Sequence, residues 1–275
     1  ALVGSQLNRA IDAQGSHVDA RGQVRDWWSQ ADRDAITKIS GDVFARNVGK
    51  AYANGDKAAY ERIHALRREG QSFAAIARQL ADDATALSKS LKDQSLVYFS
   101  GITLAILKHE TRENLLAALK AARAEGSTIA FDPNYRPRLW PDADTAKAAI
   151  AAVLAVTDIA LPTFPDEQAL YGDKDPATTA ARLAEAGVKE IVVKDGENPC
   201  LVISAENRTT VPALSVKAVD TTGAGDSFNG GYLSARLRGL PPAEAATKAH
   251  KVAGAVVQVR GALASFEILR KAFED

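Results

Sequence analysis

The chain has 275 residues, and its 34 lysine and arginine residues balance its 34 aspartate and glutamate residues. This balance gives no basic field for nucleic acid and no polybasic membrane anchor, so we expect neither partner. The one cysteine, Cys200, excludes an intrachain disulfide, and neither a signal-peptide pattern nor a bilayer-length apolar stretch is recognisable, which predicts a cytoplasmic protein.

The chain changes character near residue 85. Residues 1–85 are mostly helical in pattern and are expected to form an atypical N-terminal region. From there on, short apolar runs alternate with helical stretches. The predicted strands are 95–100, 128–132, 158–161 and 190–194, followed by an antiparallel pair at 200–204 and 208–212. The predicted helices are 110–125, 143–156, 177–186, 225–238, 242–259 and 265–273.

Strands that alternate with helices of this length form parallel βαβ units, and ligands collect at the carboxyl ends of such strands. We therefore expect residues 86–275 to form an α/β core. Its central sheet should be mostly parallel, with helices on both faces.

The strongest motif runs from Asp220 to Gly231 (DTTGAGDSFNGG). Gly223 and Gly225 allow the backbone N–H groups to turn inward, and a predicted helix begins directly afterwards with its positive dipole end facing the same point. Such a turn binds phosphate, and Asp226 among these donors can take the proton of an incoming hydroxyl. The plainer alternative is a glycine-rich helix start in which Asp226 only favours the dipole.

The second motif, FDPNYRPRLW at 131–140, directly follows a predicted strand. Pro133 and Pro137 stiffen this segment, which holds Asn134 and Arg136 in fixed positions. An arginine fork suits a carboxylate or a phosphate. The alternative is a surface segment with solvated arginines.

Both motifs resemble those of the ribokinase (PfkB) family of carbohydrate kinases, and the match is continuous over about residues 86–262. The segments 131–140 and 98–107 (YFSGITLAIL) are similar to 2-keto-3-deoxygluconate kinases of that family. The resemblance implies a ribokinase-like fold and phosphorylation of a sugar acid, most simply 2-keto-3-deoxygluconate to its 6-phosphate. It also implies ATP and Mg²⁺ as co-substrate and cofactor.

The same resemblance implies roles for individual residues. Asp226 takes the place of the catalytic base, with the anion hole formed by the backbone of Gly223, Ala224 and Gly225. Arg136 and Asn134 would orient the substrate. The implied nucleotide-binding residues are Lys194, Gly196, Thr222, Gly223 and Gly225.

Two further matches depart from the family pattern. The turn after IVVKDG (191–196) has Pro199 where the family has a second glycine. In PTFPDEQALYG (162–172), Thr163 replaces the asparagine of the Asn-x-x-Glu motif, and Asp166 replaces the glutamate that helps hold Mg²⁺ through water. Glu167 is a competing candidate, and a helix-start acid is the alternative for both. The small residues of 249–262 resemble the wall of the adenine pocket, or serve tight helix packing.

The N-terminal third matches the family poorly. Gly41 and Asp42 are the only trace of the sugar-binding Gly-Gly-Asp-x-x-Asn motif, and Ala45 stands where its asparagine is expected. We therefore expect a reduced or rearranged lid. Family members often form dimers through their lids, so the sequence leaves open whether this chain forms a homo-oligomer. The alternatives are another sugar kinase of this family, or a kinase-like core that binds nucleotide without productive turnover.

Two rival functions arise from the same third. Residues 66–80 (LRREGQSFAAIARQL) resemble a resolvase-type helix-turn-helix, but DNA binding would require a basic surface. Residues 11–28 resemble a stretch that follows the zinc helix of neprilysin-type peptidases. The His-Glu-x-x-His that binds zinc is absent from the sequence.

Overall fold

The computed structural model describes residues 84–205, 207–261 and 264–274. The predicted N-terminal region up to residue 83, with Gly41, Asp42, the expected lid and the helix-turn-helix-like segment, lies outside them. Within the described residues, six strands form one sheet in the order β1-β2-β3-β4-β5-β6. The first four strands are parallel, and β5 and β6 are added antiparallel.

The strands are β1 (Leu96–Ser100), β2 (Thr128–Asp132), β3 (Ile159–Ala160), β4 (Glu190–Asp195), β5 (Asn198–Ile203) and β6 (Arg208–Val211). The helices on one side are α6 (Ala84–Leu91), α7 (Gly101–Ile106), α8 (His109–Ala124), α9 (Ala143–Leu154), α10 (Phe164–Tyr171) and α11 (Pro176–Glu185), with the short 3₁₀ helix η1 (Pro137–Leu139). The last three helices are α12 (Ala224–Leu237), α13 (Pro242–Val256) and α14 (Phe266–Glu274). The predicted mostly parallel sheet with helices on both faces is confirmed, whereas α6, α7 and α10 were not predicted.

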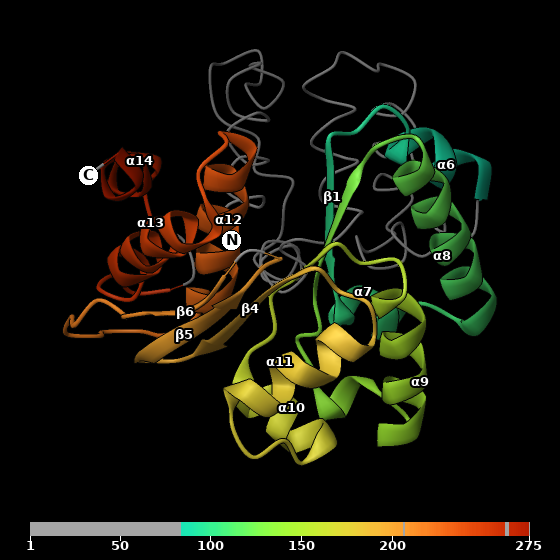
Figure 1. Ribbon diagram of the computed structural model, residues 1–275, viewed down its shortest axis with the longest axis horizontal. Helices are drawn as coiled ribbons and strands as arrows, with labels where there is room; N and C mark the ends of the chain where they lie inside the picture. The colour runs from blue at the N-terminus through green and yellow to red at the C-terminus, as the bar shows by residue number, and fades with distance from the viewer. Residues whose placement is uncertain (1–83, 206, 262–263, 275) are drawn as a thin grey trace, which may run out of the picture.

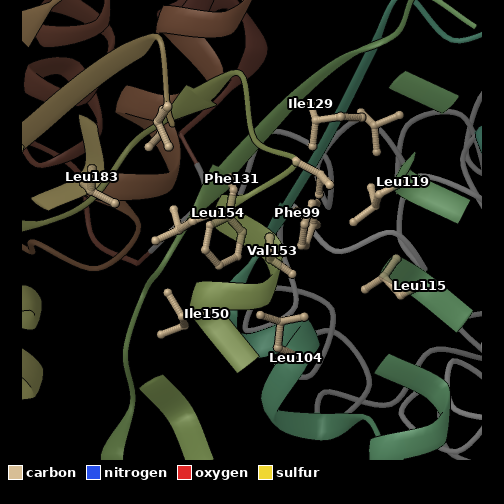
Figure 2. Packing of buried hydrophobic residues seen from close by; sticks show 14 of the residues in the cluster. Phe99, Leu104, Leu115, Leu119, Ile129, Phe131, Ile150, Val153, Leu154 and Leu183 are labelled. Carbon is tan, nitrogen blue, oxygen red and sulfur yellow. The ribbon is translucent and has the colours of Figure 1, made fainter. Parts of the chain in front are cut away.

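The larger hydrophobic core lies between one face of the sheet and the helices α6 to α11 (Figure 1). Phe99 of β1 and Phe131 of β2 meet there, with ring centroids 5.0 Å apart. Figure 2 shows Leu119 of α8 and Ile150 of α9 among the side chains that surround them. In α8, apolar residues recur every three or four positions, so one stripe of the helix is buried against the sheet.

The opposite face of the sheet is covered by α12 and α13, which are orange in Figure 1. Successive residues of a strand point to opposite faces, so Tyr98 lies in this second core although Phe99 lies in the first. Cys200 is also buried here, and burial raises the pKa of its thiol to about 12. No helix among the described residues has both the length and the apolar character needed to cross a membrane.

The far end of α12 is tied to the start of β4 by a buried carboxylate. Glu190 accepts a hydrogen bond from the Tyr232 hydroxyl at 2.7 Å. It also accepts two from the Arg236 guanidinium, at 2.9 and 2.8 Å. A bidentate arginine–carboxylate pair fixes both distance and orientation, so this end of the helix has a defined place over the sheet.

Close packing of α12 on α13 requires a glycine at position 231. A Cβ added there would lie 3.0 Å from the Ala249 Cα and 3.3 Å from Val252 side-chain atoms. We expect Gly231→Leu to lower the free energy of unfolding by about 1–3 kcal/mol, because the two helices must separate. Urea denaturation measures this loss.

The control for this prediction is Gly254→Ala in α13. A Cβ at Gly254 would make an ordinary contact, 3.5 Å from the Leu214 Cβ. Alanine is a better helix former than glycine by about 1 kcal/mol, so this variant should be at least as stable as the parent. Equal losses in both variants would contradict the packing argument.

Candidate active site

The predicted phosphate turn is a glycine turn that opens a helix. Gly223 has φ +79°, in the left-handed region that favours glycine, and α12 begins at the next residue. Asp226 lies in the first turn of α12 and is half-buried. The Ala224 amide donates to the Thr221 carbonyl at 3.2 Å, so this predicted anion-hole donor is already used within the turn.

The Asp220 side chain joins the turn to the segment that follows α13. One of its carboxylate oxygens accepts from the Thr222 amide at 2.9 Å, and the other accepts from the Gly261 amide at 2.8 Å. The hydrogen bond from Thr222 and then that from Gly261 lower the pKa of Asp220. Thr222, a predicted nucleotide-binding residue, is exposed, and its backbone amide already donates a hydrogen bond to Asp220.

The second motif forms a tight turn directly after β2. Asn134 has φ +38°, which asparagine tolerates better than most residues, and its amide donates to Asp132 Oδ1 at 3.0 Å. Its own Oδ1 is buried and finds no hydrogen-bond partner among the described residues. A buried acceptor without a partner is costly, so a ligand hydroxyl would be favoured there.

Gly101 allows this turn to lie against the start of α7. A Cβ at Gly101 would collide with the Pro133 carbonyl oxygen. The segment 98–107 and the segment 131–140, which carry the resemblance to the same kinases, thus touch at the carboxyl edge of the sheet. Sequence reasoning assigned no role to Gly101. The close approach of the Pro133 backbone explains why a glycine is needed at this position.

Two predicted site residues bind each other. Arg136 Nη1 donates to Asp166 Oδ2 at 2.9 Å, and the two side chains are 49% and 22% exposed. Burial raises the pKa of Asp166, and the Arg136 pairing opposes that shift. Arg136, predicted to bind the substrate, and Asp166, predicted to help hold the metal, therefore lie next to each other.

Lys194 is buried, unlike a residue that meets a nucleotide at a surface. It is 6% exposed, and its ammonium donates to Asp132 Oδ2 at 2.8 Å and to Asn229 Oδ1 at 2.9 Å. A Cβ on Gly225 would lie 3.8 Å from this nitrogen, so the cation sits beneath the glycine turn. These contacts favour a supporting role for Lys194 over the predicted contact with a nucleotide.

The remaining predicted positions have structural reasons of their own. Gly196 has φ +61° in the two-residue turn between Asp195 and Asn198, where glycine is preferred. The small residues of α13 pack against α12, as Ala249 does against Gly231. A nucleotide contact by Gly196 and an adenine wall in α13 both stay predictions.

Glu167, the rival candidate to Asp166, is fully buried. It accepts from Arg182 Nη2 at 2.7 Å, and Arg182 also donates to Asp173 at 2.7 Å. The guanidinium lies over the Tyr171 ring, 3.7 Å from its centroid. Asp166, which is partly exposed, is therefore the better placed of the two acids to meet a ligand.

This burial predicts a pH dependence of stability. Burial raises the pKa of Glu167 to about 7 although Arg182 opposes it, whereas an unfolded glutamate titrates near ~4.3. Between these values the folded chain keeps a proton that the unfolded chain releases. The free energy of unfolding should therefore fall by about 4 kcal/mol as pH rises through this window.

Glu167→Gln has no proton to release and should remove that part of the slope. Urea denaturation from about pH 4.5 to 8 measures it. The matched control is Glu185→Gln, which changes an exposed carboxylate on α11 and should keep the parent slope. An unchanged slope in Glu167→Gln would show that the buried pair stays ionised throughout.

Comparison with known proteins agrees with this geometry. The family model of the pfkB family carbohydrate kinases matches residues 56–269. The chain belongs to this family. A 2-dehydro-3-deoxygluconokinase of Dickeya dadantii is 44% identical over 191 residues, which cover 68% of this chain and 62% of that protein. This chain thus spans about three fifths of the length of that relative.

Solved structures of pfkB relatives share the fold. An Escherichia coli protein described as a ribokinase II, in complex with ATP and Mg²⁺, superposes with a TM-score of 0.60 at 28% identity, covering 70% of this chain and 62% of that one. The aminoimidazole riboside kinase of Salmonella enterica, with aminoimidazole riboside and an ATP analogue, gives a TM-score of 0.60 at 27% identity, covering 70% and 68%. The arrangement of this sheet and its helices therefore also occurs in these two proteins.

Proposed function

We propose that this chain transfers the γ-phosphoryl group of ATP to the terminal hydroxyl of a sugar acid, with 2-keto-3-deoxygluconate (2-dehydro-3-deoxygluconate) as the substrate. The observation that carries the proposal is the glycine turn at Gly223, which opens α12 and sets Asp226 in its first turn. The relative that is 44% identical and is named a 2-dehydro-3-deoxygluconokinase supports the choice of sugar acid.

Asp226 is the proposed base. Its carboxylate takes the proton from the sugar hydroxyl, the oxygen forms a bond to the γ-phosphorus, and the bond from that phosphorus to the bridging oxygen of ADP breaks. Negative charge that develops on the phosphoryl oxygens faces the positive end of α12. The amides of Gly223, Gly225 and Asp226 are the proposed donors, since that of Ala224 is used within the turn.

Arg136 and Asn134 are proposed to orient the sugar acid. Arg136 is half exposed and already holds the carboxylate of Asp166, so its guanidinium is in a conformation that can hold a substrate carboxylate. The buried Asn134 Oδ1 would accept a hydrogen bond from a sugar hydroxyl. Proposed nucleotide contacts remain at Thr222, Gly223, Gly225 and Gly196.

The residues present fit a magnesium ion that enters with the nucleotide. The described residues contain no cluster of three or more His, Cys, Asp or Glu side chains that could enclose a metal. Mg²⁺ commonly binds through one or two carboxylates, water and substrate phosphates, and Asp166 is the proposed carboxylate. When bound, the ion offsets the charge of the phosphates.

The test is an assay of ADP release with and without 2-keto-3-deoxygluconate, with fructose and ribose as neutral sugars. Release that depends on the sugar acid, with the 6-phosphate identified by ³¹P NMR, is expected. Release with a neutral sugar alone would favour another sugar kinase of the family. ATP binding without release would leave a nucleotide-binding core. Tight, salt-sensitive duplex binding in a gel shift would replace the proposal with DNA binding.

A further inference from the structure

A closed polar network lies beneath the first turn of α12. Its members are Asp132 at the end of β2, Lys194 near the end of β4, and Asn229 in α12, which are 2%, 6% and 0% exposed. Lys194 donates to both Asp132 and Asn229, and Asn229 Nδ2 donates to Asp132 Oδ2 at 2.6 Å. Asn229 Nδ2 also donates to the Tyr98 hydroxyl at 3.0 Å. Both the oxygen and the nitrogen of the Asn229 side-chain amide are therefore hydrogen-bonded.

Burying an ion pair gives little net stability, because the cost of desolvating two charges offsets their attraction. The network does fix geometry, since its members come from two strands and one helix that lie far apart in sequence. Asn229 is three residues, less than one helical turn, after Asp226. A displacement of Asn229 therefore displaces the proposed base.

Asp132 also holds the other half of the site. Its Oδ1 accepts from the Asn134 amide, and its Oδ2 accepts from Lys194 and Asn229. One carboxylate thus joins the turn that carries Asn134 and Arg136 to the helix that carries the base. Sequence reasoning assigned no role to Asp132 or Asn229.

We propose that Asp132, Lys194 and Asn229 are positioning residues for phosphoryl transfer, and that Asp132 sets the distance between the sugar-binding turn and the first turn of α12. This inference rests on the proposed function of the site. The network touches neither substrate in this scheme and acts by holding the groups that do. A misplacement of about 1 Å can cost about 10²-fold in rate, which sets the effect expected when the network is removed.

The decisive variant is Asp132→Asn combined with Lys194→Met. Single changes would leave a buried charge without its partner and could prevent folding, whereas the double change removes both charges at similar volume. The remaining amide has one acceptor oxygen for the donors of both Asn134 and Asn229. The link between the two halves is therefore lost even in a folded chain.

The matched control is Arg236→Gln. It weakens the tie between the same helix and the same strand, but at the Glu190 end, away from the glycine turn. A general loss of stability in α12 would affect both variants. A positioning role affects only the double variant.

Two readouts decide the question. In the double variant we expect kcat to fall about 10²-fold, with the ATP KM nearly unchanged. We also expect the amides of residues 223–229 to exchange hydrogen about tenfold faster. Arg236→Gln should keep kcat and speed exchange only near residues 234–238. A folded double variant with parental kcat and exchange, or an equal fall of kcat in the control, would overturn the proposal.

The exchange measurement does not depend on activity. If the parent chain released no ADP with any sugar, the proposed function would fail by itself. Unchanged exchange at 223–229 in the double variant would still overturn the network, and faster exchange confined to that turn would support it.

Discussion

Asp226→Asn is expected to lower kcat for the sugar acid by about 10³-fold, the middle of the range that a positioned general base contributes. Asparagine keeps the size and the polarity of the side chain but cannot accept the hydroxyl proton. ATP binding should change little, because the backbone amides of the turn stay in place. Steady-state ADP release and calorimetric titration with ATP measure the two effects.

The control Glu244→Gln removes the same charge from the same part of a neighbouring helix. Glu244 is exposed in the first turn of α13, so its loss weakens only a helix-dipole interaction of about 0.3–1 kcal/mol. If Asp226 only interacted favourably with the helix dipole, both variants would lose a little stability and keep their turnover. That result would remove the base from the proposed mechanism.

Arg136→Gln is expected to raise the KM for the sugar acid by about 10–100-fold, because a charge-assisted hydrogen bond contributes about 1.5–3 kcal/mol. Glutamine cannot form the two parallel bonds that a guanidinium offers a carboxylate. The KM for ATP should stay the same. Turnover of any neutral sugar that the parent accepts should also be unaffected, so the ratio of the two sugar activities reports the change.

Arg138→Gln is the matched control, since Arg138 is exposed in the adjoining 3₁₀ helix η1. It removes one positive charge two residues away and tests whether charge alone attracts the substrate. Equal effects of the two changes would indicate general electrostatic attraction. An unchanged sugar-acid KM in Arg136→Gln would mean that another group holds the carboxylate.

The fold was predictable where burial leaves a pattern in the sequence. Strands β1, β2 and β4 are nearly continuous apolar runs because both faces of the sheet are covered. Helix α7 was missed because it follows β1 without a break: Ser100 ends the strand, and Gly101 starts the helix. Helix α10 was missed because its apolar residues show no clear helical face, and only Glu167 and Leu170 in it are buried.

The candidate site was predictable only where its residues lie together in the sequence. The turn with Gly223 and Asp226 is one contiguous motif, as is the turn with Asn134 and Arg136. The network beneath them joins positions 62 and 97 residues apart, so no spacing reveals it. One signal was available, because Lys194 near the end of an otherwise apolar strand must find a buried partner.

Because α12 is held to β4 at both ends, by Asn229 near its beginning and by Arg236 near its finish, it serves as a stationary frame. A rod anchored at two points along its length resists tilting, so we expect it to keep its angle to the sheet throughout a catalytic cycle. If the sugar hydroxyl and the Asp226 carboxylate come closer during the cycle, the sugar and the parts of the chain that hold it must move, while α12 stays in place.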